Sequence, residues 1–475
     1  MKLSTEQIIS LLGCLPVVQA KNPDQMIESL TWDSRMVQAG GAFLALAGEH
    51  VDGNDFLEAA LQQGAALLIA SRPTSPSLRQ QATEAGAAVI EVLDAEFSLG
   101  EIARYWRDFL TAQVIGVTGS SGKTSTKELI ALVLGQRFKT QMSPGNFNNL
   151  LGLPAALLDC RSDTELLVLE MGMQHKGEIS RYAQIARPQY AVFTNIGLAH
   201  LELLGSQRAI AEAKAELLIA LPDQQGLAVL NGDDPMSDYL LQFSAAQKRG
   251  IQIIKYGLSN QHQVYASDLE FDQSGQPSFK VNLPENENFR VSLKLSGQHS
   301  VLNALAATAI AHLLGVSTGD IQTGLEAAEP MSQRQEIIEH PSGTRLINDC
   351  YNANPDSMRA SLQAFNLMSP ERVHIAVLGD MLELGPRQTE LHKSIGNLVA
   401  ELKLDMLVTV GERADWIAQA AAECGLEMNR IHSFLDWQEA VKLLLPELRF
   451  EPIILVKASR SMALERIVEA LSTSS

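Results

Sequence analysis

The stretch Val114-Ile-Gly-Val-Thr-Gly-Ser-Ser-Gly-Lys-Thr-Ser-Thr-Lys-Glu128 joins an apolar strand to a helix through a loop of small residues. Glycines in this loop remove Cβ atoms where a backbone wraps an anion, and the N-terminus of the following helix directs N–H groups toward it. Lys123 can reach terminal phosphates, and the Thr124 hydroxyl can hold a magnesium ion. The sequence therefore predicts a nucleoside triphosphate site whose loop residues are Thr118, Gly119, Ser120, Ser121, Gly122, Lys123 and Thr124.

The spacing of this loop departs from the common pattern, because Val117 stands where G-x-x-x-x-G-K-[ST] has its first glycine. The alternative is an ordinary turn between a strand and a helix. The Lys-Thr ending disfavours that alternative, and so does the helical spacing of the apolar positions that follow. We therefore interpret the stretch as a phosphate-binding loop.

Composition restricts the class of protein. A chain of 475 residues is too long for one core and predicts two to four domains. A formal net charge of -18 leaves no basic surface for a nucleic acid. There is no signal sequence and no run of about 18 apolar residues, so we expect a cytoplasmic protein without membrane insertion. The four cysteines lack C-x-x-C spacing, which predicts reduced, buried small residues.

A first domain is predicted over residues 1–94, with an opening helix at 5–12 and short strands separated by glycines. Its segment Asp33-Ser34-Arg35 places a hydroxyl beside a guanidinium in a loop. That pair of groups can bind a phosphate or pyrophosphate. Considered alone, the segment is better interpreted as a surface ion pair.

A central domain is predicted over residues 95–328. It begins with an amphipathic helix whose apolar positions are Phe97, Ile102, Trp106 and Phe109. Strands at 165–171, 190–195 and 227–231 alternate with helical stretches, as in a doubly wound parallel sheet. Ligands of such sheets gather at the carboxyl ends of the strands. Short alternating strands at 278–282 and 289–295 predict an antiparallel addition.

Three residues of this domain stand out chemically. Glu170 closes a strand that reads as buried, where an unpaired carboxylate is costly unless it meets a cation. Lys214 lies four residues from both Ile210 and Leu218, on the apolar stripe of its helix, so it either snorkels or has a function. His200 follows a strand and, taken alone, is best interpreted as a hydrogen-bonded loop histidine.

A third domain is predicted over residues 329–475, where strands at 345–349, 374–378, 406–410 and 453–456 alternate with helices. This alternation is typical of a Rossmann-like sheet. No G-x-G-x-x-G opens it, which argues against a bound dinucleotide.

Several segments together resemble the Mur ligase family of peptidoglycan synthesis, over essentially the whole chain. They include Val117–Thr124, Gly145–Pro154, Glu170–Gly172, Asn195–Leu201, Ala213–Glu216, Gly297–Ala306, Met331–Glu336, Asn348–Met358, Leu378–Gly385 with His392, and Val456–Ser461. The resemblance implies an α/β protein of three domains: a small UDP-binding domain, a central P-loop ATPase domain with a doubly wound sheet, and a C-terminal Rossmann-like domain. Ser300 and Ala458 depart from the family pattern, which has asparagine and glycine at these positions.

The resemblance also implies an activity. An ATP-dependent ligase would join D-alanyl-D-alanine to UDP-N-acetylmuramoyl-tripeptide through an acyl phosphate, giving ADP, phosphate and the pentapeptide. In the family, the lysine matching Lys214 is carbamylated by carbon dioxide, and with Thr124, Glu170 and His200 it would bind two magnesium ions. We expect a monomer whose partners are these small molecules.

The resemblance assigns further roles residue by residue. Arg334 would approach the terminal phosphate of ATP when the domains close, Asn303 would contact adenine, and Asp349 would contact ATP elsewhere. The residues expected to bind the other substrates are Asp33, Ser34, Arg35, Asn146, Asn149, Asn354, Ser357, Asp380 and Glu383.

Two other functions share parts of this pattern. A folylpolyglutamate synthase has the phosphate loop and also couples a carboxylate to an amine, but lacks a first domain with Asp-Ser-Arg. A P-loop switch or regulatory ATPase needs no substrate domains and hydrolyses ATP without a second substrate. A ligase, in contrast, requires its carboxylate substrate, so incubation with ATP alone separates the two classes.

Overall fold

The computed structural model describes residues 1–48 and 51–474 and contains two compact units. The first unit comprises Met1–Gly116, Lys139–Met173 and Gly177–Tyr190, and the second comprises Val117–Phe138, Gln174–Lys176 and Ala191–Ser475. Both units combine parallel strands with helices, so the predicted α/β class is confirmed.

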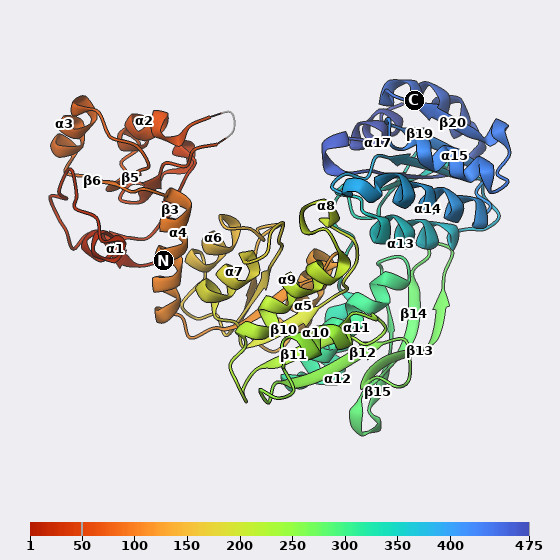
Figure 1. Ribbon diagram of the computed structural model, residues 1–475, viewed down its shortest axis with the longest axis horizontal. Coiled ribbons are helices and arrows are strands. Elements are labelled where there is room, and N and C mark those ends of the chain that lie inside the picture. The colour runs from red at the N-terminus through yellow and green to blue at the C-terminus, as the bar shows by residue number, and fades with distance from the viewer. Residues whose placement is uncertain (49–50, 475) are drawn as a thin grey trace. The chain divides into compact units, whose positions relative to one another are not determined.

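The first unit begins with a four-stranded parallel sheet in the order β3-β4-β5-β6. Side chains of α2 and α3 and of the sheet, among them Phe43, Leu68 and Val89, form one buried cluster. The opening helix α1 begins and ends where the sequence predicts, with Ser4 capping its N-terminus. The bounds of these elements are β3 Leu30–Thr31, β4 Ala42–Leu44, β5 Leu67–Ala70, β6 Ala88–Glu91, α1 Thr5–Leu12, α2 Leu57–Gln62 and α3 Pro76–Ala85 (Figure 1).

The remainder of the first unit packs α4 (Ala95–Trp106) against α6 (Gly152–Leu158) and α7 (Glu178–Ala186). Strands β8 (Thr140–Met142) and β9 (Leu166–Glu170) pair in parallel. The predicted apolar face of α4 is only partly correct. Ile102 and Trp106 are buried, but Phe97 is exposed beneath the guanidinium of Arg181, and Phe109 is exposed in a 3-10 turn beyond the helix.

Strands β7 (Gln113–Thr118) and β10 (Tyr190–Phe193) run across the boundary between the units. In the second unit, the end of β7 continues into the phosphate loop and α5 (Lys123–Leu134), which packs against α11 (Gln298–Leu313) and α12 (Thr318–Glu326). Helix α9 spans Gln207–Ala220 and α8 spans Leu201–Leu204. Strands β11 (Leu227–Asn231), β12 (Gln252–Gly257) and β13 (Val264–Phe271) are parallel neighbours.

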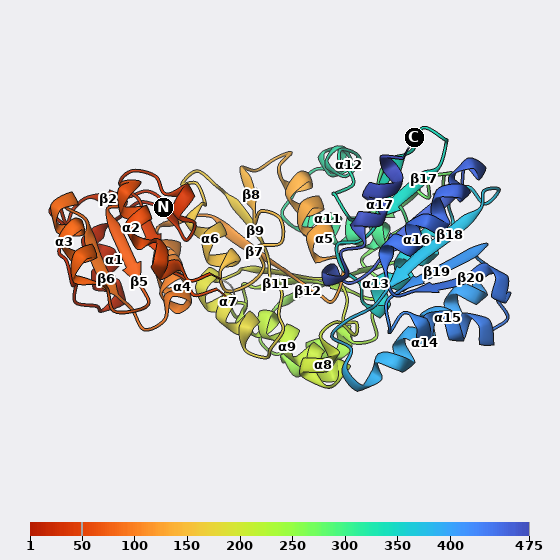
Figure 2. The same cartoon turned by 90° about the horizontal axis from the view of Figure 1, so that it is seen from above.

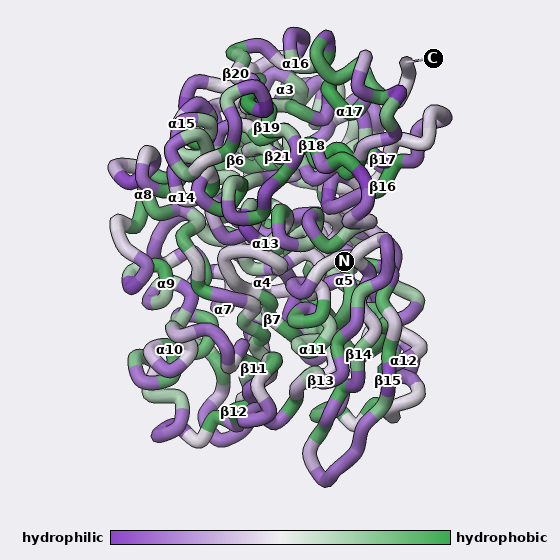
Figure 3. The backbone as a smooth tube through the Cα atoms, turned by 90° about the vertical axis from the view of Figure 1, so that its right-hand side faces the viewer, coloured by the Kyte–Doolittle hydropathy of each residue, from purple (hydrophilic) through white to green (hydrophobic). Residues whose placement is uncertain are grey.

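The predicted antiparallel addition is confirmed. Strand β14 (Pro277–Asn282) pairs antiparallel with both β13 and β15 (Asn288–Ser292). Buried and partly exposed residues alternate along β14, as expected for a strand with one face on the core. The turn between β14 and β15 is hydrophilic (Figure 3).

The C-terminal part of the second unit is a six-stranded sheet in the order β16-β17-β21-β18-β19-β20. All neighbours are parallel except the edge pair β16–β17, so the predicted Rossmann-like sheet is confirmed. Figure 2 shows α16 and α17 on one face and α14 and α15 on the other. The bounds are β16 Glu336–Glu339, β17 Arg345–Asn348, β18 His374–Gly379, β19 Met406–Val410, β20 Ile431–Phe434, β21 Ile453–Lys457, α13 Pro355–Asn366, α14 Gln388–Glu401, α15 Asp415–Glu423, α16 Trp437–Leu444 and α17 Glu465–Ser472.

The cysteines follow the prediction in part. All four are free thiols, and Cys160 and Cys350 are buried. Cys14 is half-buried and Cys424 is exposed, so the prediction that all four are buried is wrong. Cys424 directly follows α15 as its C-cap residue, a position that carries no burial requirement. Among the described residues, no helix has the length and apolar character needed to cross a membrane.

Candidate active site

The phosphate loop is held open by neighbouring residues of the second unit. The N–H of Ser120 donates to the carbonyl of Asn195, and the N–H of Ser121 donates to Asn195 Oδ1 at 2.9 Å. A Cβ added at Gly119 would lie 1.8 Å from Thr194 Oγ1. Gly122 has φ 78° and serves as N-cap of α5. This close packing explains why small residues are needed in the loop. The N–H groups at the N-terminus of α5 lie at the end of the same loop.

Two lysines converge on this loop. Lys123 Nζ donates to the carbonyl of Gly119 at 3.0 Å, and Lys214 Nζ donates to the same carbonyl at 2.8 Å. Lys214 is 1% exposed on the inner face of α9, so its position on the apolar stripe is confirmed. Burial, followed by the charge of Lys123, holds the pKa of Lys214 well below its usual range. Within the described part of the chain Lys214 forms no ion pair.

Arg334 reaches the same loop from the loop before β16. Its Nη2 donates to Thr124 Oγ1 at 2.9 Å, and its guanidinium lies over the ring of Tyr351. The structure thus places Arg334 beside the first turn of α5, together with Lys123 and Lys214. The charges of Lys123 and Arg334 around a loop of N–H groups create a site for a polyanion.

His200 contacts Glu383, a residue that the sequence analysis predicts to bind substrate. The residue has φ 61° at the N-terminus of α8, and its Nδ1 lies 2.7 Å from Glu383 Oε2. This hydrogen bond is the main cause of the lowered pKa of Glu383. Metal-bound histidines commonly hold a carboxylate through one ring nitrogen and present the other to the metal. The geometry therefore fits a ligand role for His200 Nε2, and it gives Glu383 a contact with His200 in addition to its predicted substrate role.

The segment before His200 is fixed by two aspartates. The N–H of Ile196 donates to Asp234 Oδ2 at 2.5 Å, and the N–H of Leu198 donates to Asp356 Oδ2 at 2.8 Å. Gly197 lies between them, and a Cβ there would be 1.9 Å from Asp356 Oδ2. Asp356, on α13, was not predicted as a site residue, although it lies inside the segment Asn348–Met358 that carries the family resemblance.

Asn303 lies against the end of the phosphate loop. Its Oδ1 accepts a hydrogen bond from Thr126 Oγ1 at 3.1 Å, and a Cβ at Gly122 would approach that same oxygen to 2.8 Å. The hydroxyl of Ser300 donates to the carbonyl of Ser296 at 2.7 Å. Ser300 therefore completes its own helix start, while the adenine contact of Asn303 stays a prediction.

Glu170 lies in the first unit. It ends β9, is 1% exposed, and accepts a hydrogen bond from Asn148 Nδ2 at 2.8 Å. Asn149 Oδ1 accepts from the N–H of Gly152 at 2.8 Å, so this residue ties down the start of α6, and Asn146 is exposed in the preceding turn. Asn148 was missed by sequence reasoning, and its signal is the asparagine-rich run Asn146-Phe-Asn-Asn149 that it shares with the two predicted residues.

Asp33, Ser34 and Arg35 also belong to the first unit. Asp33 caps a 3-10 turn at Ser34–Met36, and its carboxylate accepts two hydrogen bonds from the guanidinium of Arg35, at 2.9 and 2.7 Å, and one from the Arg35 N–H at 3.0 Å. The Arg35 hydrogen bond lowers the pKa of Asp33 to about 2. The surface ion pair considered from the sequence is therefore present, and the Arg35 side chain is 86% exposed.

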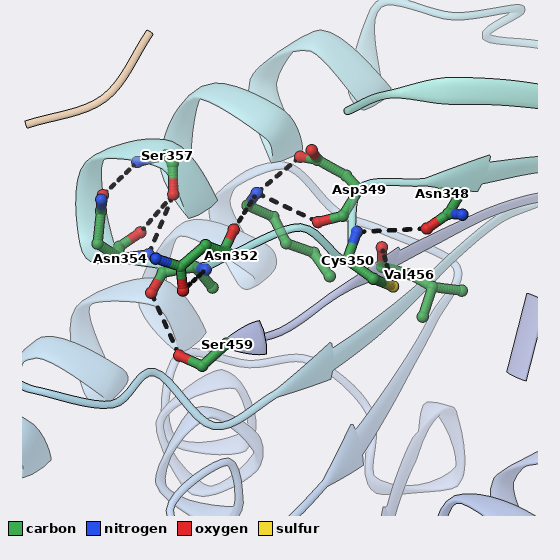
Figure 4. Close-up of polar contacts among 10 residues, drawn as sticks. Asn348, Asp349, Cys350, Asn352, Asn354, Ser357, Val456 and Ser459 are labelled. Carbon is green, nitrogen blue, oxygen red and sulfur yellow. Dashed lines mark hydrogen bonds and ion pairs between the residues drawn. The ribbon is translucent and has the colours of Figure 1, made fainter. Parts of the chain in front are cut away.

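Lys457, another buried lysine, ends β21 and binds the loop after β17. Lys457 Nζ lies 2.7 Å from Asp349 Oδ2 and also donates to the carbonyl of Asn352 at 3.0 Å. Asn354 and Ser357 form a reciprocal capping box at the start of α13 (Figure 4). Asp380 Oδ1 accepts from the N–H groups of Arg413 and Ala414. Asp349, Asn354, Ser357 and Asp380 thus form hydrogen bonds or ion pairs within the protein. Their roles in binding ligands stay predictions.

Lys457 was not predicted, although a lysine ending an apolar strand is the same signal that drew attention to Glu170. Lys457→Met should lower the free energy of unfolding by about 3–5 kcal/mol, because it leaves the carboxylate of Asp349 buried without its cation. The double variant Lys457→Met/Asp349→Asn should recover much of that loss. Urea unfolding measures both changes, and equal stability of Lys457→Met and the parent chain would contradict the assignment.

Comparison with known proteins is consistent with this site. Three family models match the chain: Mur ligase family, catalytic domain, at residues 26–107; Mur ligase middle domain at 117–311; and Mur ligase, glutamate ligase domain, at 333–460. The phosphate loop lies in the second match and Arg334 in the third. The chain belongs to the Mur ligase family, whose members are ATP-dependent ligases that form amide bonds.

Several of the similar proteins share one name. UDP-N-acetylmuramoyl-tripeptide–D-alanyl-D-alanine ligase of Bacillus subtilis is 35% identical, covering 94% of this chain and 93% of that protein. The ligase of the same name from Escherichia coli is 33% identical, with 95% of each chain covered. A crystal structure of MurF from Acinetobacter baumannii superimposes with a TM-score of 0.87 at 31% identity, covering 100% of this chain and 99% of that one. MurF from Thermotoga maritima in complex with ADP gives a TM-score of 0.80 at 28% identity, covering 93% and 96%.

Proposed function

We propose that this chain joins D-alanyl-D-alanine to UDP-N-acetylmuramoyl-tripeptide at the expense of ATP. The observation that carries the proposal is the convergence of Lys123, Lys214 and Arg334 on the phosphate loop, in a chain similar along nearly its full length to ligases of that name. The three domains we propose are residues 1–94 for the UDP substrate, 95–328 for ATP and 329–475 for the incoming dipeptide.

The chemistry follows from the demands of an amide bond. A free carboxylate is a poor electrophile, so the terminal carboxylate of the tripeptide attacks the γ-phosphate of ATP, ADP leaves, and an acyl phosphate forms. The amine of D-alanyl-D-alanine then attacks the acyl carbon, phosphate leaves and the amine loses a proton. Lys123 and Arg334 neutralise the charge of the transferred phosphoryl group, which is mainly positioning and electrostatics.

Magnesium is the metal we propose beside the phosphate loop, because hydroxyl, carboxylate and carbamate oxygens are the kind of ligand it prefers. Among the described residues, no group of three or more His, Cys, Asp and Glu side chains gathers to hold a metal, so such an ion depends on other ligands. The ligands we propose for two ions are the Thr124 hydroxyl, Glu170, His200 and a carbamate on Lys214. Bound magnesium would neutralise phosphate charge. The low pKa of Lys214 supports the modification, because only the neutral amine reacts with carbon dioxide, giving a carbamate and a proton.

Arg35 is the residue proposed to hold the pyrophosphate of the UDP substrate, exchanging its bond to Asp33 for the ligand. Arg35→Ala should raise the dissociation constant for the UDP substrate by roughly 10- to 100-fold, the effect of losing hydrogen bonds to a charged group. The affinity for ATP should stay unchanged. Calorimetric titration with each ligand measures both, and an equal loss of both affinities would contradict the assignment.

Phosphate release tests the proposed function. With ATP, UDP-muramoyl-tripeptide and D-alanyl-D-alanine together, phosphate should appear in step with the pentapeptide product. Parallel reactions with lysine or diaminopimelate as the third residue identify the natural tripeptide. Phosphate release from ATP alone at the same rate would instead favour a switch or regulatory ATPase. We place this reaction in the cytoplasm and expect the chain to act as a monomer.

A further inference from the structure

The loop that carries Arg334 has an unusual backbone. Gln333 and Gln335, on either side of Arg334, have φ values of 60° and 52°, a region that side-chain-bearing residues rarely adopt. The carboxylate of Glu336 holds this loop by accepting from the N–H of Gln333 at 2.9 Å, and Asn348 Nδ2 lies 3.3 Å from the same oxygen. Residues kept in such a backbone by surrounding bonds commonly serve a functional geometry.

Tyr351 contacts this loop twice. Its backbone N–H donates to the carbonyl of Gln333 at 3.1 Å, and its ring lies under the guanidinium of Arg334, with Cζ 3.8 Å from the ring centroid. In the described part of the chain, the hydroxyl of Tyr351 forms no hydrogen bond. The side chain therefore contributes the face of its ring rather than its polar tip.

The residues that contact Arg334 do not neutralise its positive charge. No carboxylate forms an ion pair with Arg334 among the described residues; its side chain meets the Thr124 hydroxyl and the ring of Tyr351. Arg35, in contrast, is bound by both oxygens of Asp33. A ring face attracts and orients a guanidinium through its quadrupole without carrying a negative charge. An anion near the phosphate loop therefore meets the full charge of Arg334.

We infer that Tyr351 is a positioning residue for the ligase reaction, whose ring orients Arg334 toward the phosphoryl group while leaving its charge unneutralised. This inference rests on the proposed function. Arg334 acts on the transferred phosphoryl group, so loss of the ring should lower kcat more than it changes the KM for ATP.

Changing the electron density of the ring distinguishes a cation–π role of Tyr351 from a role in packing alone. Tyr351→Phe should keep kcat within about threefold, because the hydroxyl is not used. Phenylalanine analogues carrying one, two and three ring fluorines keep nearly the same shape but weaken the ring face stepwise. We expect kcat to fall with each fluorine, and Tyr351→Leu to lower kcat by about 3- to 30-fold, the range of a cation–π contact. The KM for ATP should change by less than about twofold.

Two further variants complete the test. In the Arg334→Ala background, Tyr351→Leu should have no additional effect on kcat. Phe450→Leu removes a surface contact of the same kind with Arg449 and should leave kcat unchanged. A kcat that is insensitive to fluorination, or that falls equally in both Arg334 backgrounds, would overturn the inference. Absence of any ligase activity in the parent chain would refute the proposed function itself, so the two failures are distinguishable.

Discussion

Lys214→Ala is expected to lower ligase turnover by about a thousandfold without unfolding the protein. The side chain of Lys214 is buried against the phosphate loop, its pKa is held well below the usual range, and it has no acidic partner among the described residues. Removing a proposed ligand of an ion that stabilises transition-state charge by several kcal/mol accounts for an effect of this size. Coupled phosphate release measures turnover, and circular dichroism confirms the fold.

Two comparisons make the Lys214 result specific. Lys214→Arg keeps a long basic side chain but should be as inactive as Lys214→Ala, because a guanidinium does not form the carbamate. Added formate or acetate should restore part of the activity of Lys214→Ala by supplying a carboxylate in the vacated space. Lys176→Ala, which removes an exposed lysine paired with Glu212, is the matched control and should be active. Full activity of Lys214→Arg would contradict the carbamate.

Arg334→Ala is expected to lower kcat by at least about a thousandfold, the lower end of the range for arginines that stabilise phosphoryl transfer. The structure supports this expectation because Arg334 already contacts Thr124, the first-turn residue of α5, and keeps its charge. The KM for ATP should change far less than kcat, since the interaction strengthens as charge develops. Steady-state kinetics at saturating UDP substrate and dipeptide separates the two constants.

The control for Arg334 is Arg449, an exposed arginine of the same predicted domain. Arg449→Ala, which removes an exposed guanidinium stacked on Phe450, should leave kcat within experimental error. Arg334→Lys should recover only a small part of the activity, because lysine lacks the planar fork of donors. A value of kcat above a tenth of the parent rate in Arg334→Ala would count against the proposed role.

Much of the fold was predictable because local patterns determine it. The strands Leu227–Asn231 and Met406–Val410 were predicted to the residue, since continuous apolar runs bounded by polar residues are typical of buried parallel strands. Strand β16 was missed, because half-exposed edge strands such as Glu336–Glu339 carry no apolar run. Phe97 was misassigned because helical spacing does not report what covers each face.

The candidate site was predictable to a lesser extent. The phosphate loop, Lys214 and Arg334 were identified through motif and resemblance, and the structure brings them together. Partners far apart in sequence were not predictable. The bond between His200 and Glu383 spans 183 residues, and the contact of Tyr351 with Arg334 depends on how two loops meet. Such pairings are set by tertiary packing rather than by local pattern.

Transfer of oxygen tests the central claim most directly. UDP-muramoyl-tripeptide labelled with ¹⁸O in its terminal carboxylate is incubated with the chain, ATP and D-alanyl-D-alanine, and the released phosphate is analysed by mass spectrometry. The acyl-phosphate route predicts one ¹⁸O in each phosphate released, because the attacking carboxylate oxygen stays on phosphorus when the amine displaces it. Unlabelled phosphate formed together with the pentapeptide would contradict the proposed mechanism.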